Sequence, residues 1–160
     1  MNEREFFRAR RQAEFPAFMR VLQALPKERL DYRPHERSPT AAQIAWTLAS
    51  ELRACCDLAA TGRVDWNPAP PPALEEAVAD FECHHARLDA LVAGLDDAGW
   101  RRSGQFVVGT RVAMEQPVAD LLWLFLFDGI HHRGQLSTYI RPMGGRVPSI
   151  YGPSGDEPAT

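Results

Sequence analysis

An aspartate and a histidine four residues apart, Asp128 and His132, lie near the end of the most apolar segment of the chain, LLWLFLFDGIHHRGQL (121–136). On a helix this spacing places both side chains on one face, and the apolar residues before them predict that this face is buried. An unpaired carboxylate in such a place costs several kcal/mol. We therefore expect Asp128 to be neutralised, to pair with another group or to bind a metal ion.

A second acidic side chain, Glu51, lies at the centre of the apolar face predicted for segment 43–60. Helical bundles build metal sites from an acid and a histidine one turn apart on one helix and from further ligands on a facing helix. The sequence thus predicts one divalent metal ion bound by Glu51, Asp128 and His132. Carboxylate oxygens and imidazole nitrogens suit Zn, Ni, Fe or Mn better than Ca and do not distinguish among these four metals.

Two neighbouring residues are lesser candidates for the same metal site. Thr47 lies on the flank of the inward face, one turn before Glu51. His131 precedes His132 but points about 100° away from it on a helix. We therefore expect His131 to support the site or the fold rather than to bind the metal.

A site without metal is the alternative interpretation of these residues. The acids and the histidine would then form a buried hydrogen-bonded network, or Glu51 would pair with Arg133 or Arg53. Two other chemistries lack their motifs in this sequence. Ser137 follows His132 without the glycine frame of a nucleophile elbow, and no glycine-rich phosphate loop is present.

Four segments with helical periodicity must position the candidate ligands. They cover about residues 3–24, 38–62, 73–95 and 117–140. Ser38 and Pro39 are predicted to start the second segment, and Gly62 to end it. The sequence QFVVGTRVAM (105–114) could form a short hairpin or lie extended. Four helices with little strand signal predict an all-α four-helix bundle, in a single domain of residues 1–160 with a long connection before the fourth helix.

Two proline-rich segments lie outside the predicted helices. WNPAPPP (66–72) cannot continue a helix and is predicted to be a stiff linker. The C-terminal tail contains Ile150 and Tyr151 among its prolines and glycines. We therefore expect the tail to lie against the body of the protein.

The composition excludes several classes of partner. The chain has 160 residues, of which 45% are hydrophobic and 24% charged, and a formal net charge of −3, values typical of a globular protein. Its basic residues are mixed with acids, so the electrostatic footprint of a nucleic-acid-binding protein is missing. The charged N-terminal segment is unlike a signal peptide, and the apolar run before Asp128 is too short to span a bilayer. We therefore expect no nucleic acid or membrane partner and a cytoplasmic location.

The fourth helical segment ends in HHRGQL (131–136), and this motif at the end of an apolar helix resembles the signature of the DinB/YfiT-like superfamily. The order of the four helices, the region around Trp100 and the proline-rich tail agree with this resemblance, which covers almost the whole chain. It implies an antiparallel four-helix bundle, often dimeric, with one divalent metal ion held by a histidine on the second helix and by two residues four apart on the fourth. His132 would be the last ligand. Asp128 matches the preceding ligand, which is usually histidine but is an acid in a branch similar to mycothiol-dependent maleylpyruvate isomerase.

The second helix departs from the family pattern, which places a histidine near Trp46 or Thr47. This chain has no histidine there, and Glu51, about one turn further on, is the only strong donor on the inward face. Either the site is rebuilt from Glu51, Asp128 and His132, or the three residues remain as a polar core network. We favour the rebuilt site, because two inward acids without a cation or two protons would be unfavourable.

The resemblance implies a metal-dependent enzyme that acts on a small-molecule substrate. It would be a transferase or isomerase that uses a low-molecular-weight thiol, or a hydrolase-like enzyme, in which the metal lowers the pKa of a bound thiol or water. The competing hypotheses are a non-catalytic, stress-associated protein that binds a metal or ligand, and a purely structural dimer.

A homodimer is expected from the fourth helix, which is apolar around its whole circumference and must be covered on every side. Either the connection 96–116 and the tail or a second subunit would cover it, and the family resemblance and the frequency of two-fold assemblies favour the second subunit. The residues concerned are Leu122, Trp123, Leu124, Phe127 and Ile130.

Overall fold

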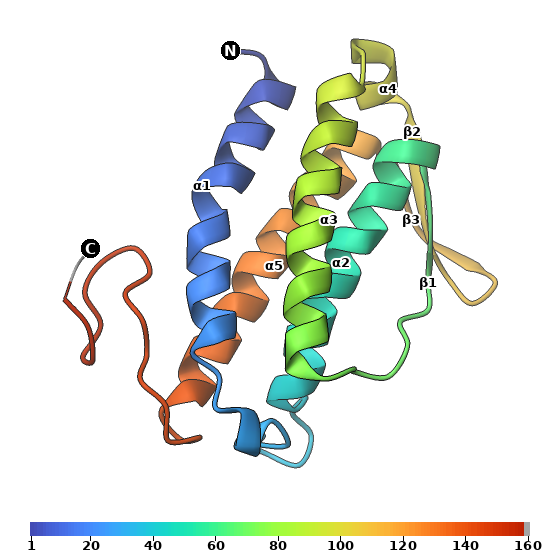
Figure 1. The fold of residues 1–160 in the computed structure, drawn as a ribbon. Helices are drawn as coiled ribbons and strands as arrows, with labels where there is room; N and C mark the ends of the chain where they lie inside the picture. The colour runs from blue at the N-terminus through green and yellow to red at the C-terminus, as the bar shows by residue number, and fades with distance from the viewer. Residues whose placement is uncertain (159–160) are drawn as a thin grey trace.

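The computed structural model describes residues 1–158 and shows four long helices that run side by side, with a small sheet at one edge (Figure 1). The long helices are α1 (Glu3–Gln23), α2 (Ala41–Thr61), α3 (Leu74–Gly94) and α5 (Val118–Ile140). A short 3₁₀ turn, η1 (Lys27–Arg29), follows α1, and the short helix α4 (Asp97–Arg101) follows α3. The four predicted helices are confirmed to within a few residues at each end.

The ends of α2, which carries Glu51, follow from its capping residues. The Thr40 hydroxyl accepts a hydrogen bond from the backbone N–H of Gln43, and the Gln43 side chain accepts one from the backbone N–H of Thr40. This reciprocal cap starts the helix at Ala41, so the prediction of a start at Ser38 was wrong. Gly62 ends the helix as predicted, with a φ of 80° that glycine adopts most readily.

The structure also contains a three-stranded mixed sheet, so the prediction of an all-α fold was wrong in this respect. Its strands are β1 (Arg63–Trp66), β2 (Ser103–Val108) and β3 (Arg111–Pro117), in that order. The hairpin predicted as one alternative for residues 105–114 exists as β2 and β3, which are antiparallel and turn at Gly109. β1 pairs with β2 in parallel and was not predicted from the sequence. Val64 of β1 is buried between exposed neighbours, as in a strand with one face against the core.

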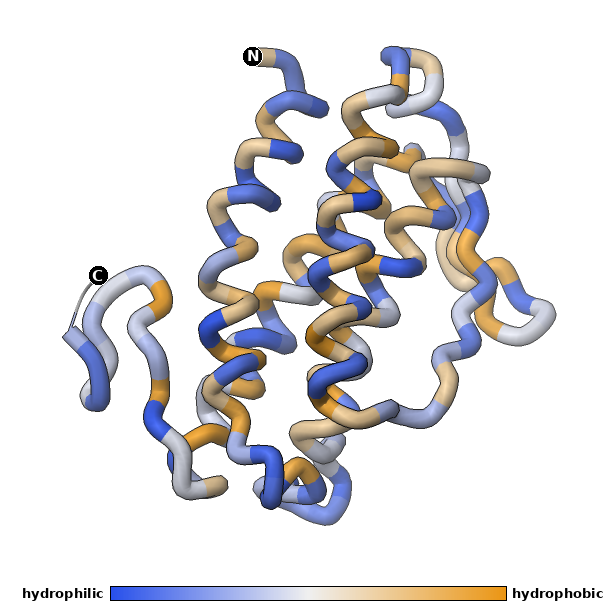
Figure 2. The backbone as a smooth tube through the Cα atoms, in the orientation of Figure 1, coloured by the Kyte–Doolittle hydropathy of each residue, from blue (hydrophilic) through white to orange (hydrophobic). Residues whose placement is uncertain are grey.

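The core consists of two clusters of apolar side chains that meet along α2. One cluster includes Phe18, Leu48 and Leu136, and the other includes Phe7, Cys55 and Leu121. Figure 2 shows hydrophobic and hydrophilic segments alternating along the long helices, as amphipathic helices around a common core require. α2 packs on α3 and α5, whereas α1 packs chiefly on α3 and α5 and less on α2, the next long helix in the chain. Glu51 lies on α2 between Leu48 and Cys55, where the two clusters meet.

The C-terminal tail lies beside α1 (Figure 1), and its predicted packing against the body is confirmed. Val147 and Ile150 pack on the first core cluster. The Tyr151 hydroxyl accepts a hydrogen bond from Arg133 of α5 at 2.5 Å and donates one to Glu14 of α1 at 2.6 Å. The tail therefore joins the first and the last long helix.

Helix α5 keeps apolar side chains on its outer surface. Leu122 is buried, and Trp123 is half-buried with its ring against Phe7 of α1, 5.0 Å between ring centres. Leu124 and Phe127 remain 41% and 60% exposed. Despite this apolar character, neither α5 nor any other helix in residues 1–158 meets the length and hydropathy needed to cross a membrane.

Candidate metal centre

Helices α2 and α5 bring the side chains of Glu51, Asp128 and His132 together. Each residue offers one donor atom, and the three donor atoms lie within 4.8 Å of one another. The Nε2 atom of His132 is 3.5 Å from Oε1 of Glu51 and 3.8 Å from Oδ2 of Asp128. Because Asp128 and His132 are one helical turn apart on α5, the helix itself aligns them toward Glu51 on α2.

The three side chains differ in burial, which gives the cluster a closed and an open side. Glu51 is 5% exposed, whereas the Asp128 side chain is 50% exposed and the His132 side chain 21%. The carboxylate on α2 thus lies in the core, and the carboxylate on α5 lies at the surface. A small molecule can reach the cluster from the side of Asp128.

The imidazole of His132 is oriented by Gln135, one turn further along α5. Its Nδ1 atom is 2.8 Å from Oε1 of Gln135. An amide oxygen only accepts hydrogen bonds, so Nδ1 carries the ring proton and Nε2 presents its lone pair to the two carboxylates. Metal-binding histidines commonly donate the N–H of the other ring nitrogen to such an acceptor, which fixes the orientation of the ring.

Burial of Glu51 makes its charged form unfavourable. Burial, and then the charge of the neighbouring Asp128 carboxylate and a side-chain hydrogen bond to it, raise the pKa of Glu51 to about 9. Its Oε2 atom is buried and has no hydrogen-bond partner among residues 1–158. A divalent cation would reverse both effects, because it favours the ionised carboxylate and satisfies the free oxygen. The donor set of two carboxylates and one neutral imidazole therefore fits a divalent metal ion.

We expect Glu51→Gln to stabilise the metal-free protein on the order of 3 kcal/mol at pH 7. The pKa of Glu51 is raised on folding, from the usual 4.5 to about 9, so the native state holds a proton that the unfolded chain releases. Stability is then lost as the pH rises between these two values, and glutamine removes this loss. Urea unfolding at pH 5 and pH 7 measures the effect, which should be larger at pH 7.

The matched control for this prediction is Glu82→Gln, at an exposed glutamate on α3. A surface substitution of this kind changes stability little at either pH. An equal gain from Glu51→Gln at pH 5 and pH 7 would contradict the raised pKa of Glu51.

The charge pairs proposed for Glu51 as an alternative are not formed. Arg133 pairs with Glu14 at 2.7 Å, and Arg53 pairs with Asp80 at 2.7 Å. Both arginines therefore form ion pairs with carboxylates other than that of Glu51. Glu51 is left with Asp128 and His132 as its polar neighbours.

The two lesser candidates lie at the margin of the cluster. His131 is exposed, and its ring centre is 5.5 Å from that of His132. Thr47 uses its hydroxyl to donate a hydrogen bond to the Gln43 carbonyl at 2.9 Å, along its own helix. The group of His, Cys, Asp and Glu donors formed by the described residues contains Glu51, Asp128 and His132 without His131.

The sequence did not predict the contact of Gln135 with His132 or the buried pair of Arg133 with Glu14. Gln135 could have been found from its spacing of three residues from His132 on the same helix. Arg133 and Glu14 are 2% and 3% exposed in their side chains. Their pairing spans 119 residues of sequence, so no local pattern indicates it.

Comparison with known proteins agrees with this architecture. The uncharacterized protein YrdA of Bacillus subtilis strain 168 is 27% identical over 145 residues, which cover 90% of this chain and 85% of that protein. The crystal structure of a DinB-like protein from Bacillus cereus ATCC 10987 superposes with a TM-score of 0.75 at 18% identity and covers 92% of this chain and 97% of its own. A mycothiol-dependent maleylpyruvate isomerase superposes with a TM-score of 0.62 at 12% identity, over 91% of this chain and 62% of the isomerase. The two solved structures share the fold.

The sequence model of the DinB superfamily matches residues 12–136. This range begins in the third turn of α1 and ends with the HHRGQL segment of α5. It includes all three residues of the Glu51, Asp128 and His132 cluster. The chain belongs to the DinB superfamily.

Proposed function

We propose that the protein is a divalent-metal-dependent enzyme that acts on a small molecule, with Glu51, Asp128 and His132 as the metal ligands. The observation that carries this proposal is the buried Glu51 carboxyl group, whose free Oε2 atom lies in a cluster with a second carboxylate and an oriented imidazole. A structural polar network would be expected to satisfy this oxygen.

Some residues of the cluster hold the metal ion, and others leave one side of it open to solvent. Gln135 holds the His132 ring with Nε2 toward the carboxylates, and Glu51 supplies the ligand from the core side. Three protein ligands leave coordination positions for a non-protein group, as in catalytic sites. The half-exposed Asp128 side chain marks the side from which that group enters. A divalent ion held here would act as a Lewis acid and lower the pKa of a thiol or water bound to it.

A low-molecular-weight thiol is the co-substrate that we infer for this enzyme. The support is the shared fold with a mycothiol-dependent maleylpyruvate isomerase. The proposed reaction class is accordingly a transfer or isomerisation in which the thiol attacks a small electrophilic molecule. Zn, Ni, Fe and Mn all suit the donor set.

A non-catalytic protein that binds a metal or ligand is the second candidate, and the size of the nearby cavity favours it. The cavity that Glu51 lines has a volume of about 30 Å³. Drug-sized ligands occupy pockets of about 300–1,000 Å³, so a substrate would have to bind largely at the surface beside Asp128.

Elemental analysis of the protein, purified without an affinity tag, tests the metal site. We expect one divalent ion per chain, bound more weakly than at an all-histidine site because carboxylates are weaker ligands than imidazoles for late transition metals. The metal-loaded protein is then assayed for consumption of mycothiol and other small thiols in the presence of maleylpyruvate and other small electrophiles. Metal binding without thiol consumption would favour the non-catalytic candidate. A protein that binds no divalent ion would overturn the proposed metal site.

We also propose that the protein is a homodimer that covers the exposed apolar side of α5. Trp123 contacts Phe6 and Phe127, with ring centres 5.9 and 5.7 Å apart, so these rings form one aromatic surface across α1 and α5. Phe6 and Phe127 are 49% and 60% exposed, and the tail lies elsewhere. Light scattering at micromolar concentration should give twice the chain mass, and Phe127→Glu should give a monomer. A monomer mass for the unaltered protein would contradict the proposal.

A further inference from the structure

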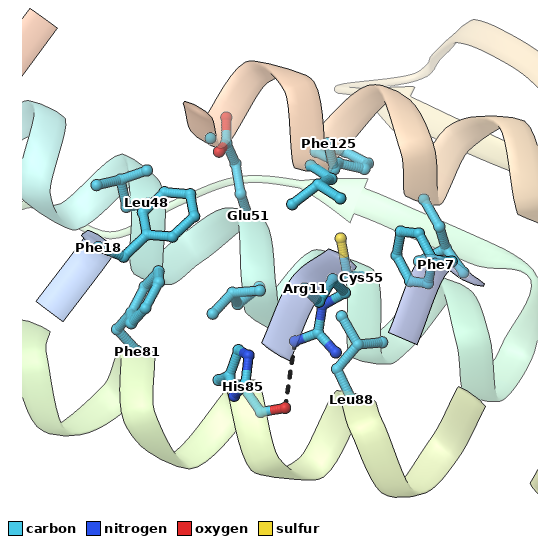
Figure 3. A pocket seen from close by; sticks show the side chains of 14 residues that line it. Phe7, Arg11, Phe18, Leu48, Glu51, Cys55, Phe81, His85, Leu88 and Phe125 are labelled. Carbon is cyan, nitrogen blue, oxygen red and sulfur yellow. Dashed lines mark hydrogen bonds between the residues drawn. The ribbon is translucent and has the colours of Figure 1, made fainter. Parts of the chain in front are cut away.

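All four long helices enclose a small cavity in the core, and Glu51 forms part of its wall (Figure 3). Most of the wall is apolar, with rings and aliphatic chains such as those of Phe18, Phe81 and Leu88. Its volume is about 30 Å³. A buried water needs about 10–15 Å³ on this measure, so there is room for about two water-sized groups.

A buried guanidinium group also lines this cavity. Arg11 of α1 is 3% exposed. Its Nη2 atom donates a hydrogen bond to the backbone carbonyl of His85 at 3.2 Å, as Figure 3 shows, and its Cζ atom lies 5.9 Å from the centre of the Phe7 ring. Its Nη1 atom is buried and has no hydrogen-bond partner among residues 1–158. Burial makes the charge of Arg11 unfavourable and so lowers its pKa.

No carboxylate of residues 1–158 lies within ion-pair distance of Arg11, in contrast to Arg133. The buried Arg133 has Glu14 at 2.7 Å. Asp89, an acid that acts on Arg11 at longer range, is bound by Arg8 at 2.8 Å. A buried cation without an anion costs several kcal/mol, so the position of Arg11 calls for a negative charge beside it.

His85 and Cys55 of the cavity wall are uncharged at pH 7 and do not balance the charge of Arg11. Burial, and then the positive charge of Arg11, lower the pKa of His85 to about 4. Burial raises the pKa of the Cys55 thiol well above its usual value. The Nε2 atom of His85 is a second buried atom without a hydrogen-bond partner in the described part of the chain. The cavity wall thus holds a buried cation without an ion-pair partner and, beside it, a further unsatisfied polar atom.

We propose that this cavity is a binding site for a small monovalent anion, held by the free Nη1 atom of Arg11 with the His85 imidazole beside it. The anion is an inorganic ion or the carboxylate end of a small molecule. A carboxylate has two oxygens and so matches the room for about two water-sized groups. Phosphate and sulfate are too large for that room and carry more charge than one guanidinium balances.

The place of the cavity links this anion site to the proposed metal centre. Glu51 lines the cavity and also belongs to the cluster with Asp128 and His132. A carboxylate bound at Arg11 therefore lies beside that cluster, and the substrate class becomes small carboxylic acids. This last step rests on the proposed function, whereas the anion site itself does not.

Thermal unfolding of the metal-free protein tests the anion site, with sodium bromide and sodium formate as probes and sodium fluoride at equal ionic strength as reference. A ligand at ten times its dissociation constant should raise the melting temperature by about 3–6 °C. Arg11→Met, which keeps the length of the side chain and removes its charge, should lose this increase. Arg8→Met is the matched control one turn earlier on α1, where the arginine is partly exposed and already paired, and it should keep the increase.

Bromide-soaked crystals of the unaltered protein give a direct measurement that does not depend on the folding of any variant. We expect an anomalous scattering peak beside Nη1 of Arg11. A formate response without a bromide response identifies a carboxylate site, and a response to both identifies a site for small anions in general. Equal shifts in the unaltered and Arg11→Met proteins, or no response to either bromide or formate, would overturn the proposal. His132→Ala should keep the anion response, so failure of the metal site and failure of the anion site are distinguishable.

Discussion

Replacing His132 with alanine is expected to abolish the binding of a stoichiometric divalent ion. His132 supplies the only imidazole of the cluster, and its Nε2 atom lies within 4 Å of a carboxylate oxygen on each of the two facing helices. Without it, Glu51 and Asp128 remain as two acids on opposite helices, which do not hold a late transition metal tightly. Elemental analysis after dialysis, and calorimetric titration with zinc, measure the loss.

Two further variants make this result specific to the His132 ring. His131→Ala changes the adjacent, exposed imidazole and should leave the bound metal unchanged. Gln135→Ala removes the partner that orients the ring and should weaken metal binding by about 10–100-fold. A His132→Ala protein that retains one metal ion per chain would rule out the proposed ligand set.

Replacing Glu14 with alanine is expected to lower the free energy of unfolding by about 3–5 kcal/mol, because it leaves a buried charge without its partner. Arg133 is 2% exposed in its side chain and receives its charge balance from Glu14 at 2.7 Å. The tail adds the Tyr151 hydroxyl to the same carboxylate. Urea unfolding followed by circular dichroism measures the change. A loss below about 1 kcal/mol would contradict the importance of this pair, since that is the size typical of surface pairs.

The pH dependence of stability gives an independent test of the same ion pair. Burial alone would raise the pKa of Glu14, but the hydrogen bonds from Tyr151 and Arg133 outweigh it, and the pKa lies below the usual value. The stabilisation is therefore fully present above the usual pKa of 4.5 and is lost as the pH falls below it. Glu75→Ala at the exposed pair with Lys27 is the matched control and should leave the unfolding midpoint nearly unchanged.

The helices and the gathering of the three donor residues could be predicted from the sequence because both depend on local spacing. A separation of four residues sets Asp128 and His132 on one face wherever the helix lies, and the apolar face of α2 carries Glu51 inward. The strand β1 has no such local signature. It pairs in parallel with β2, with Arg63 opposite Gln105, and a parallel partner is fixed by the tertiary fold rather than by a turn between the strands.

The buried charges of α1 were missed for a different reason. Arg11 and Glu14 share the helical stripe of Phe7 and Phe18, at spacings of three and four residues, so the pattern already placed them inward. What the sequence does not contain is the identity of their partners. Arg133 is more than a hundred residues away from Glu14, and the cavity beside Arg11 exists only when four helices have packed.

The packing of α1 on α3 and α5 has a consequence for the synthesis of this protein on the ribosome. Helix α1 emerges before the helices that cover its apolar face, and the last of these, α5, ends only at Ile140. At about 5–20 residues per second the delay after α1 is on the order of ten seconds. During that time Phe7 and Phe18, which are almost fully buried in the native state, are exposed on the nascent chain. The apolar face of α1 is therefore a part of the core that stays uncovered until synthesis of this fold is nearly complete.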